Sequence, residues 1–165
     1  MSLFCIHIFN TTMANLFSKN DYEATVQRIR QLSPETKAQW GKMNVNEMIC
    51  HLSDPLRDVL GDRPYKRGVP LLLRPLLKLM VLGKKPFSKN LPTIPAYLQG
   101  DKGKGTPVTG FEPDRQRLLQ LLERFHTAPA DFTFQPHPGP GKLSREQNGF
   151  FVWKHFDHHL RQFGV

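Results

Sequence analysis

Three histidines lie within five residues near the C-terminus, in the stretch HFDHH. His155 and His159 are four residues apart, and residues at that spacing lie on the same face of an α-helix. Two imidazoles placed in this way can point at one metal ion. The pair leaves coordination positions empty, so a third ligand has to come from another part of the chain. The spacing therefore predicts part of a metal site.

His51 is the candidate for the third ligand. It lies at the edge of an apolar stripe that includes Met48 and Leu52, and this stripe is expected to face the core. A lone histidine in that setting is more often a core residue with its hydrogen bonds satisfied, and the C-terminal pair is what favours a ligand role. Asp54 and Asp157 are candidates to orient the ligand histidines, although helix-surface aspartates are more often simply solvated.

Helix geometry separates the other histidines from this set. At about 100° per residue, His159 lies close to the inward stripe of Val152 and Phe156, whereas His158 lies on the other side of His155. We therefore expect His158 to be peripheral, at most a hydrogen-bonding neighbour of the ligands. His137, in the turn HPGPG, could reach the mouth of the site, but an ordinary loop residue is the safer interpretation.

The positive charge of the chain is concentrated in one segment. The formal net charge is +9, and residues 63–104 hold ten basic residues and one acidic residue, which accounts for all of the excess. Such a patch attracts a carboxylate or phosphate substrate, nucleic acid or an anionic membrane, although a solvated basic loop is equally compatible. The candidates for anion binding are Arg63, Lys66, Arg67 and Arg74.

The cysteines and the hydropathy favour a cytoplasmic protein. Cys5 and Cys50 form neither a disulfide framework nor a CxxC pair, which is typical of a reducing compartment. The longest apolar run, residues 69–82, contains two basic residues and is shorter than the roughly 20 residues of a membrane span. Residues 1–12 lack the features of a secretory signal. We expect them to be a disordered or spurious extension, and residues 13–165 to form one domain.

Four segments have the pattern of main helices. Asn20 with Glu23, Asn44 with Glu47 and Ser144 with Gln147 have the spacing of capping boxes, and apolar residues follow each at helical intervals. Pro55 should kink the second helix. The expected helices span residues 20–32, 44–60, 112–126 and 144–165.

The region between the second and third main helices is the least regular. Residues 61–110 hold seven of the fourteen prolines. We expect one short helix at 70–82 and then a long irregular excursion through 86–110, and loops of this length are often functional or mobile. A short strand at 131–134 is the one alternative to helix. The sequence thus predicts an all-α fold, a four-helix bundle with a long irregular excursion.

Two segments carry a resemblance to a known family. WGKMNVNEMICHLSD (40–54) and HPGPGKLSREQNGFFVWKHFDHHLRQFGV (137–165) resemble the DinB/YfiT-like four-helix-bundle metalloproteins. The second is similar to a branch of unassigned function that ends in HHLRQFG. The resemblance implies that His51, His155 and His159 bind zinc, nickel or a similar divalent ion. It also implies an activity like that of relatives that are thiol-dependent transferases or isomerases, or hydrolases.

Three functional hypotheses follow. Three neutral imidazoles with an open position form a Lewis-acid site that can activate a thiol or water. The first hypothesis is a thiol-dependent S-transferase in which the basic segment holds a small anionic substrate or low-molecular-weight thiol, and the second is a metal-dependent hydrolase. The third is a non-catalytic module whose basic segment 63–104 contacts an anionic membrane. Nucleic acid is disfavoured because few aromatics interrupt that segment. The sequence is compatible with both a monomer and a homodimer.

Overall fold

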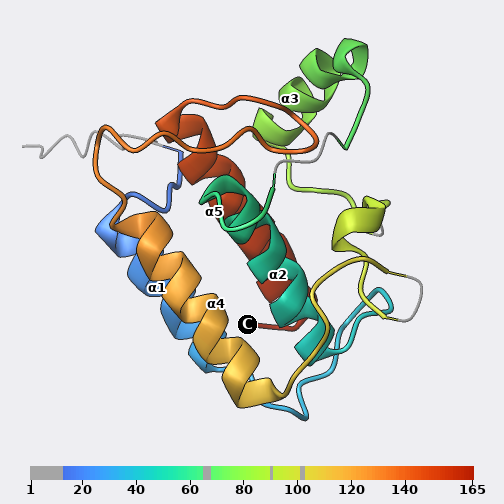
Figure 1. Ribbon diagram of the computed structural model, residues 1–165. Coiled ribbons are helices and arrows are strands. Elements are labelled where there is room, and N and C mark those ends of the chain that lie inside the picture. Colours follow the sequence, from blue (N-terminus) through green and yellow to red (C-terminus); the bar gives the residue numbers. More distant parts are fainter. Residues whose placement is uncertain (1–12, 65–67, 90, 101–102) are drawn as a thin grey trace, which may run out of the picture.

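The computed structural model describes residues 13–64, 68–89, 91–100 and 103–165. This part of the chain contains five α-helices, two short 3-10 helices and no strand, so the all-α prediction is confirmed for it. The expectations for residues 1–12, Lys66 and Arg67 fall outside the described residues. The α-helices are α1 (Lys19–Arg30), α2 (Val45–Val59), α3 (Arg74–Leu82), α4 (Phe111–His126) and α5 (Arg145–Gln162) (Figure 1).

The two helices that carry the histidines begin at capping boxes, as the sequence predicted. At the start of α2 the Glu47 amide donates to the Asn44 side chain at 2.9 Å, and the Asn44 amide donates to the Glu47 carboxylate at 2.8 Å. Ser144 and Gln147 form the same reciprocal pair at the start of α5. The expected box at Asn20 is wrong. The Ser18 side chain caps α1 instead, because it accepts from the Asp21 amide.

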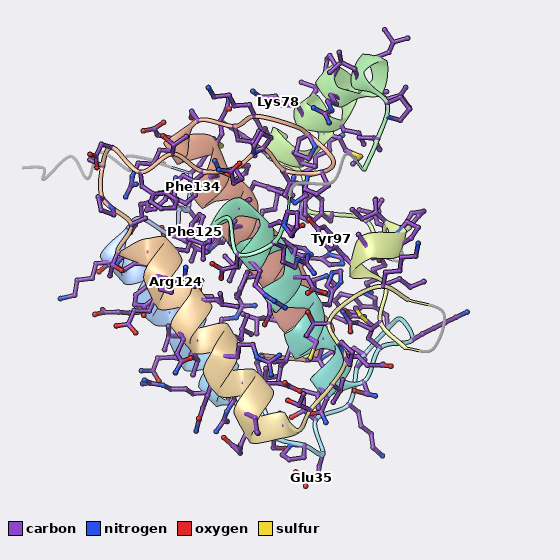
Figure 2. All side chains as sticks on the ribbon, viewed as in Figure 1. Glu35, Lys78, Tyr97, Arg124, Phe125 and Phe134 are labelled. Atoms are coloured by element: carbon purple, nitrogen blue, oxygen red, sulfur yellow. The ribbon has the colours of Figure 1, made fainter. Side chains whose placement is uncertain are left out.

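Helix α2 is the central element of the fold. It packs against α4 and α5, while α1 packs against α5 and α4 on the other side (Figure 1). Every residue of α2 from Met48 to Leu56 is buried, His51 included. Phe125 of α4 lies against Phe134, with their ring centroids 5.1 Å apart, at one end of the core (Figure 2). Because α2 is surrounded, its polar side chains must find partners within the protein.

Helix α3 projects beyond the other helices and contacts α5 (Figure 1). The segment expected as one helix at 70–82 is a 3-10 turn, Leu71–Leu73, followed by α3. Lys154 of α5 closes the end of α3, because its ammonium donates to the carbonyl of Gly83 at 2.6 Å and to that of Val81 at 3.2 Å. Much of α3 remains open to solvent, and the Leu79 side chain is 73% exposed.

The excursion between α3 and α4 is irregular apart from one 3-10 turn, Pro95–Tyr97, and it is tied to α2. Asp54 is completely buried, and its carboxylate accepts from the Thr106 amide at 3.0 Å and from the Gln99 side chain at 3.2 Å. The Tyr97 hydroxyl donates to Asp58 at 2.6 Å (Figure 2). The acidic residues of α2 therefore fix where the excursion lies.

Two further local findings complete the fold. The strand considered at 131–134 does not form, because these residues pair with no other segment in the described chain, and the nearby pairing is an isolated bridge between His137 and Gly141. Pro55 lies inside α2 without ending it. Within the described residues, no helix is both long enough and apolar enough to span a membrane.

Candidate metal centre

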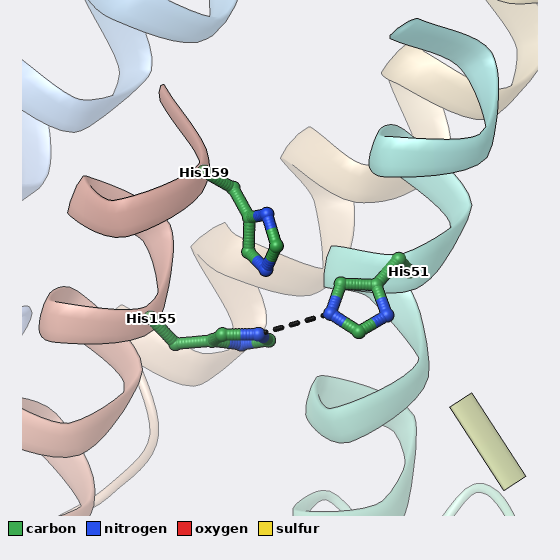
Figure 3. Close-up of side chains that lie close together, drawn as sticks. All are labelled: His51, His155 and His159. Atoms are coloured by element: carbon green, nitrogen blue, oxygen red, sulfur yellow. Dashed lines mark hydrogen bonds between the residues drawn. The ribbon is translucent and has the colours of Figure 1, made fainter. Parts of the chain in front are cut away.

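Three histidines meet between helices α2 and α5 (Figure 3). α2 contributes His51, and successive turns of α5 contribute His155 and His159. One ring nitrogen from each lies within 4.8 Å of the others, and the Nε2 atoms of His51 and His155 are 3.1 Å apart. The structure therefore brings together the three residues that the sequence singled out, although more than 100 residues separate His51 from the pair.

Hydrogen bonds fix the orientation and tautomer of two of these rings. His51 Nδ1 lies 2.9 Å from the carbonyl oxygen of Tyr97, and His159 Nδ1 lies 2.8 Å from Oε1 of Gln162. Both oxygens only accept, so each Nδ1 carries the hydrogen and each neutral ring keeps a lone pair on Nε2. The Gln162 amide is itself oriented, because its Nε2 donates to the Trp40 carbonyl at 2.6 Å. Neither acceptor was identified from the sequence.

Burial keeps all three imidazoles neutral at pH 7. It lowers the pKa of His51, and it lowers the pKa of His159 to about 3 with a further contribution from the neighbouring His51. The pKa of His155 is held well below its usual value by burial first and then by the other histidines. Metal ions bind only the deprotonated form of imidazole. The cluster is therefore in its ligand form without competition from protons.

The donor set fits a divalent transition metal. Three neutral imidazoles are the donors that zinc, nickel and related ions take in proteins. A tetrahedral ion with bonds of about 2.0–2.1 Å places its nitrogens about 3.3 Å apart, close to the 3.1 Å between Nε2 of His51 and Nε2 of His155. Hydrogen bonds from Nδ1 to a carbonyl or an amide oxygen are also typical of metal-ligating histidines. We conclude that these residues could hold such an ion.

The two aspartates expected to orient the ligands have other partners. Asp54 binds the excursion and Arg63, at 2.9 Å, and it acts on His51 through its charge. Asp157 pairs with Arg28 at 3.0 Å, and this ion pair joins α5 to α1. Asp157 also pairs with Arg161 of its own helix. Both carboxylates are paired with guanidinium groups, and their role in orienting the ligand histidines stays a prediction. The Tyr97 carbonyl and Gln162 occupy the positions expected for them.

The basic residues expected to bind an anion also have local roles. Arg63 donates to the buried Asp54 and, at 2.6 Å, to the half-buried Asp58, so it neutralises two carboxylates of its own chain. Arg74 begins α3, with its side chain beside Gly141. Anion binding by Arg63 and Arg74 stays a prediction.

Two histidines that the sequence placed outside the site line a cavity beside it. His158 is buried next to the cluster without belonging to its three candidate ligands, and its ring centroid lies 4.9 Å from that of His159. His137 is buried too, its ring centroid 4.9 Å from that of Phe151, and burial lowers its pKa to about 4. The turn HPGPG brings His137 back over α5, which the spacing of the residues did not reveal.

Two cavities reach the histidine cluster. One, of about 250 Å³, is lined by all three cluster histidines together with His137, His158 and apolar side chains of α3. The other, of about 350 Å³, is lined by His158 and His159 and by polar residues such as Lys42 and Gln99. Tyr97 contributes to both walls. Both cavities are mainly apolar, and of the two only the second has a lysine, Lys42, among its lining residues.

Comparison with known proteins gives one match. No curated protein and no solved structure matches the chain significantly. Residues 13–164 match a protein family described as a protein of unknown function, DUF1569. The matched range includes all five α-helices and the three histidines of the cluster. The chain therefore belongs to the DUF1569 family.

Proposed function

We propose that this chain is a metal-dependent S-transferase of the DinB/YfiT-like type. In this proposal α1, α2, α4 and α5 form the four-helix bundle, and His51, His155 and His159 hold a divalent ion, zinc or nickel. The observation that carries it is the cluster itself: three neutral imidazoles whose ring nitrogens lie within 4.8 Å of one another. A bound ion would supply Lewis acidity, which lowers the pKa of a thiol or of water.

The other residues of the site keep the cluster ready for a metal. The Tyr97 carbonyl and the Gln162 amide hold the Nδ1 hydrogens of His51 and His159, so that each ring has its lone pair on Nε2. Trp40 in turn holds Gln162 through its carbonyl. Losing such outer hydrogen bonds typically weakens metal binding by about 10- to 100-fold. The chain thus contributes preformed ligands and excludes protons from them by burial.

The two cavities favour a transferase over a hydrolase. Lys42 and Gln99 line the second cavity, and their side chains suit the carboxylate and amide groups of a small polar thiol. The first cavity offers a separate place for the electrophile. His159 lines both cavities, so a thiol in one and an electrophile in the other would meet at the cluster. Hydrolysis needs room for one organic substrate and water.

Thiol dependence tests this proposal. Zinc-loaded or nickel-loaded protein is incubated with 1-chloro-2,4-dinitrobenzene, with and without cysteine or glutathione. We expect the sulfur–carbon bond to form and chloride to leave faster than in the uncatalysed reaction only when both metal and thiol are present. The matched control is His126→Ala, because His126 donates to the Leu16 carbonyl and lies outside the cluster. Turnover that ignores the thiol would instead indicate a hydrolase.

The exposed face of α3 favours a second property, contact with an anionic membrane surface. Leu72 is 89% exposed and Leu79 is 73% exposed, which is unusual for large apolar side chains on one short segment. The described residues 68–89 contain no acidic residue, and Lys84 and Lys85 are exposed beside the leucines. An apolar helix face with a basic flank binds at the interface of anionic lipids. The same positive charge disfavours pairing of this face with a second copy of itself.

Vesicle sedimentation tests this second property. The protein should bind vesicles of phosphatidylcholine containing phosphatidylglycerol, and the binding should weaken at high salt. The double variant Leu72→Glu, Leu79→Glu should bind more than about tenfold more weakly, because two leucines lose their apolar burial. Val108→Glu, at an exposed apolar residue outside α3, is the control. Equal binding to vesicles of phosphatidylcholine alone would contradict the prediction.

A further inference from the structure

The cavity above the histidines is apolar on nearly every side. Leu77, Met80 and Val81 of α3 form one wall, and Phe151 of α5 and Ile94 contribute to the others. Among its described lining residues there is no lysine, arginine, aspartate or glutamate. A charged group placed there would lose its hydration without gaining an oppositely charged partner. The walls therefore select for an uncharged, apolar group.

Few hydrogen-bonding groups interrupt these walls. The Tyr97 hydroxyl already donates to Asp58. His137 accepts from the Gly139 amide on Nδ1, at 3.1 Å, so its neutral ring carries the hydrogen on Nε2 and offers a donor. The cluster histidines, His158 and Thr93 provide the remaining polar side chains. A ligand thus meets mainly apolar walls, a small number of uncharged polar groups and the cluster.

We propose that this cavity binds the apolar group of the electrophilic substrate, a compact hydrocarbon group, and that Leu77 limits its length. This inference rests on the proposed transferase function. An empty apolar cavity of about 150 Å³ is known to accept benzene, so the 250 Å³ here would accept roughly ten non-hydrogen atoms on the same scale. The substrate class is then an apolar alkyl or aryl electrophile, and the anionic partner is assigned to the second cavity, which Lys42 lines.

The test uses straight-chain 1-alkanols, from butanol to dodecanol, as neutral probes. Their dissociation constants are measured by calorimetry on zinc-loaded protein and on protein stripped with a chelator. We expect affinity to rise about fourfold for each added methylene group, and to level off when the chain fills the cavity. Binding that is absent, or that does not depend on chain length, would overturn the inference.

Variants of α3 locate the binding. Leu77→Asp should weaken the binding of octanol by more than tenfold, and Leu77→Ala should move the levelling-off to a longer alkanol because the cavity is larger. Leu72→Asp is the matched control, since Leu72 lies on the same segment and is 89% exposed. Equal octanol affinities for Leu77→Asp and Leu72→Asp would place the ligand elsewhere and overturn the inference.

Metal content measured on the same samples separates this inference from the proposed function. If the protein binds the alkanol series but takes up no zinc or nickel, the metal-dependent function is ruled out and the apolar binding cavity remains. Protein that takes up one equivalent of metal but shows no dependence on chain length would leave the metal site standing and overturn the assignment of the substrate class.

Discussion

Replacement of His159 by alanine is expected to lower the affinity for zinc by more than about a hundredfold, because loss of a ligand costs more than loss of an outer hydrogen bond, which costs about 10- to 100-fold. Two of the three imidazoles remain, and Gln162 loses the Nδ1–H group that it holds. The variant leaves the capping box of α5 intact. The measurement is equilibrium dialysis against zinc, followed by elemental analysis and by circular dichroism to verify the fold.

Two comparison variants sharpen this result. His126→Ala removes a histidine that is stacked on Tyr22, outside the cluster, and should keep one equivalent of zinc. Gln162→Ala keeps all three ligands but removes the acceptor of His159, and should give an intermediate loss of about 10- to 100-fold. If His159→Ala bound zinc as tightly as the wild type, the three-histidine site would be ruled out.

Metal-free protein is expected to lose stability steeply as the pH falls below 6.5. Burial lowers the pKa of His137 to about 4 and that of His159 to about 3, whereas in the unfolded chain both are near 6.5. Between these values the unfolded state binds protons that the folded state excludes, so stability falls as the pH decreases. Each group contributes up to about 1.4 kcal/mol per pH unit, and together they cost about 3 kcal/mol between pH 6.5 and pH 5.

Urea unfolding at pH 7.5, 6 and 5 in the presence of a chelator measures this loss. It is large against a typical unfolding free energy of about 5–15 kcal/mol. His137→Gln should reduce the slope of the unfolding free energy against pH by the contribution of one histidine, while the three cluster histidines stay in place. Zinc should raise the stability at pH 7.5, because it binds the folded protein. An unfolding free energy that is constant from pH 7.5 to pH 5 would contradict the expectation.

Local sequence patterns predicted the helices that carry the site, because the start of a helix depends on residues that are close together in the sequence. The boxes at Asn44 and Ser144 each pair a side chain with a residue three positions later, and both form as expected. The spacing of His155 and His159 is likewise a property of one helix. Ser18 was missed because Asn20 offered an equally good pattern two residues later, and only packing distinguishes the two.

The partners of the histidines could not be predicted in the same way. Gln162 lies three residues after His159 on the same helix, so a signal for it was present in the sequence and was overlooked. The Tyr97 carbonyl belongs to the irregular excursion, and no residue pattern foretells which main-chain oxygen will reach His51. Arg63 was singled out as an anion-binding candidate from a count of charges. Such a count does not show that its guanidinium group pairs with the carboxylates of Asp54 and Asp58.

The attachment of the excursion to α2 makes loop docking and metal affinity mutually dependent. The Tyr97 carbonyl reaches His51 only while the excursion is held in place, and Asp54, one turn further along α2, holds it through Thr106. By thermodynamic reciprocity, the factor by which docking strengthens metal binding is also the factor by which a bound metal strengthens docking. Metal occupancy would then be reported by hydrogen exchange at the Thr106 amide, a group that does not belong to the metal site.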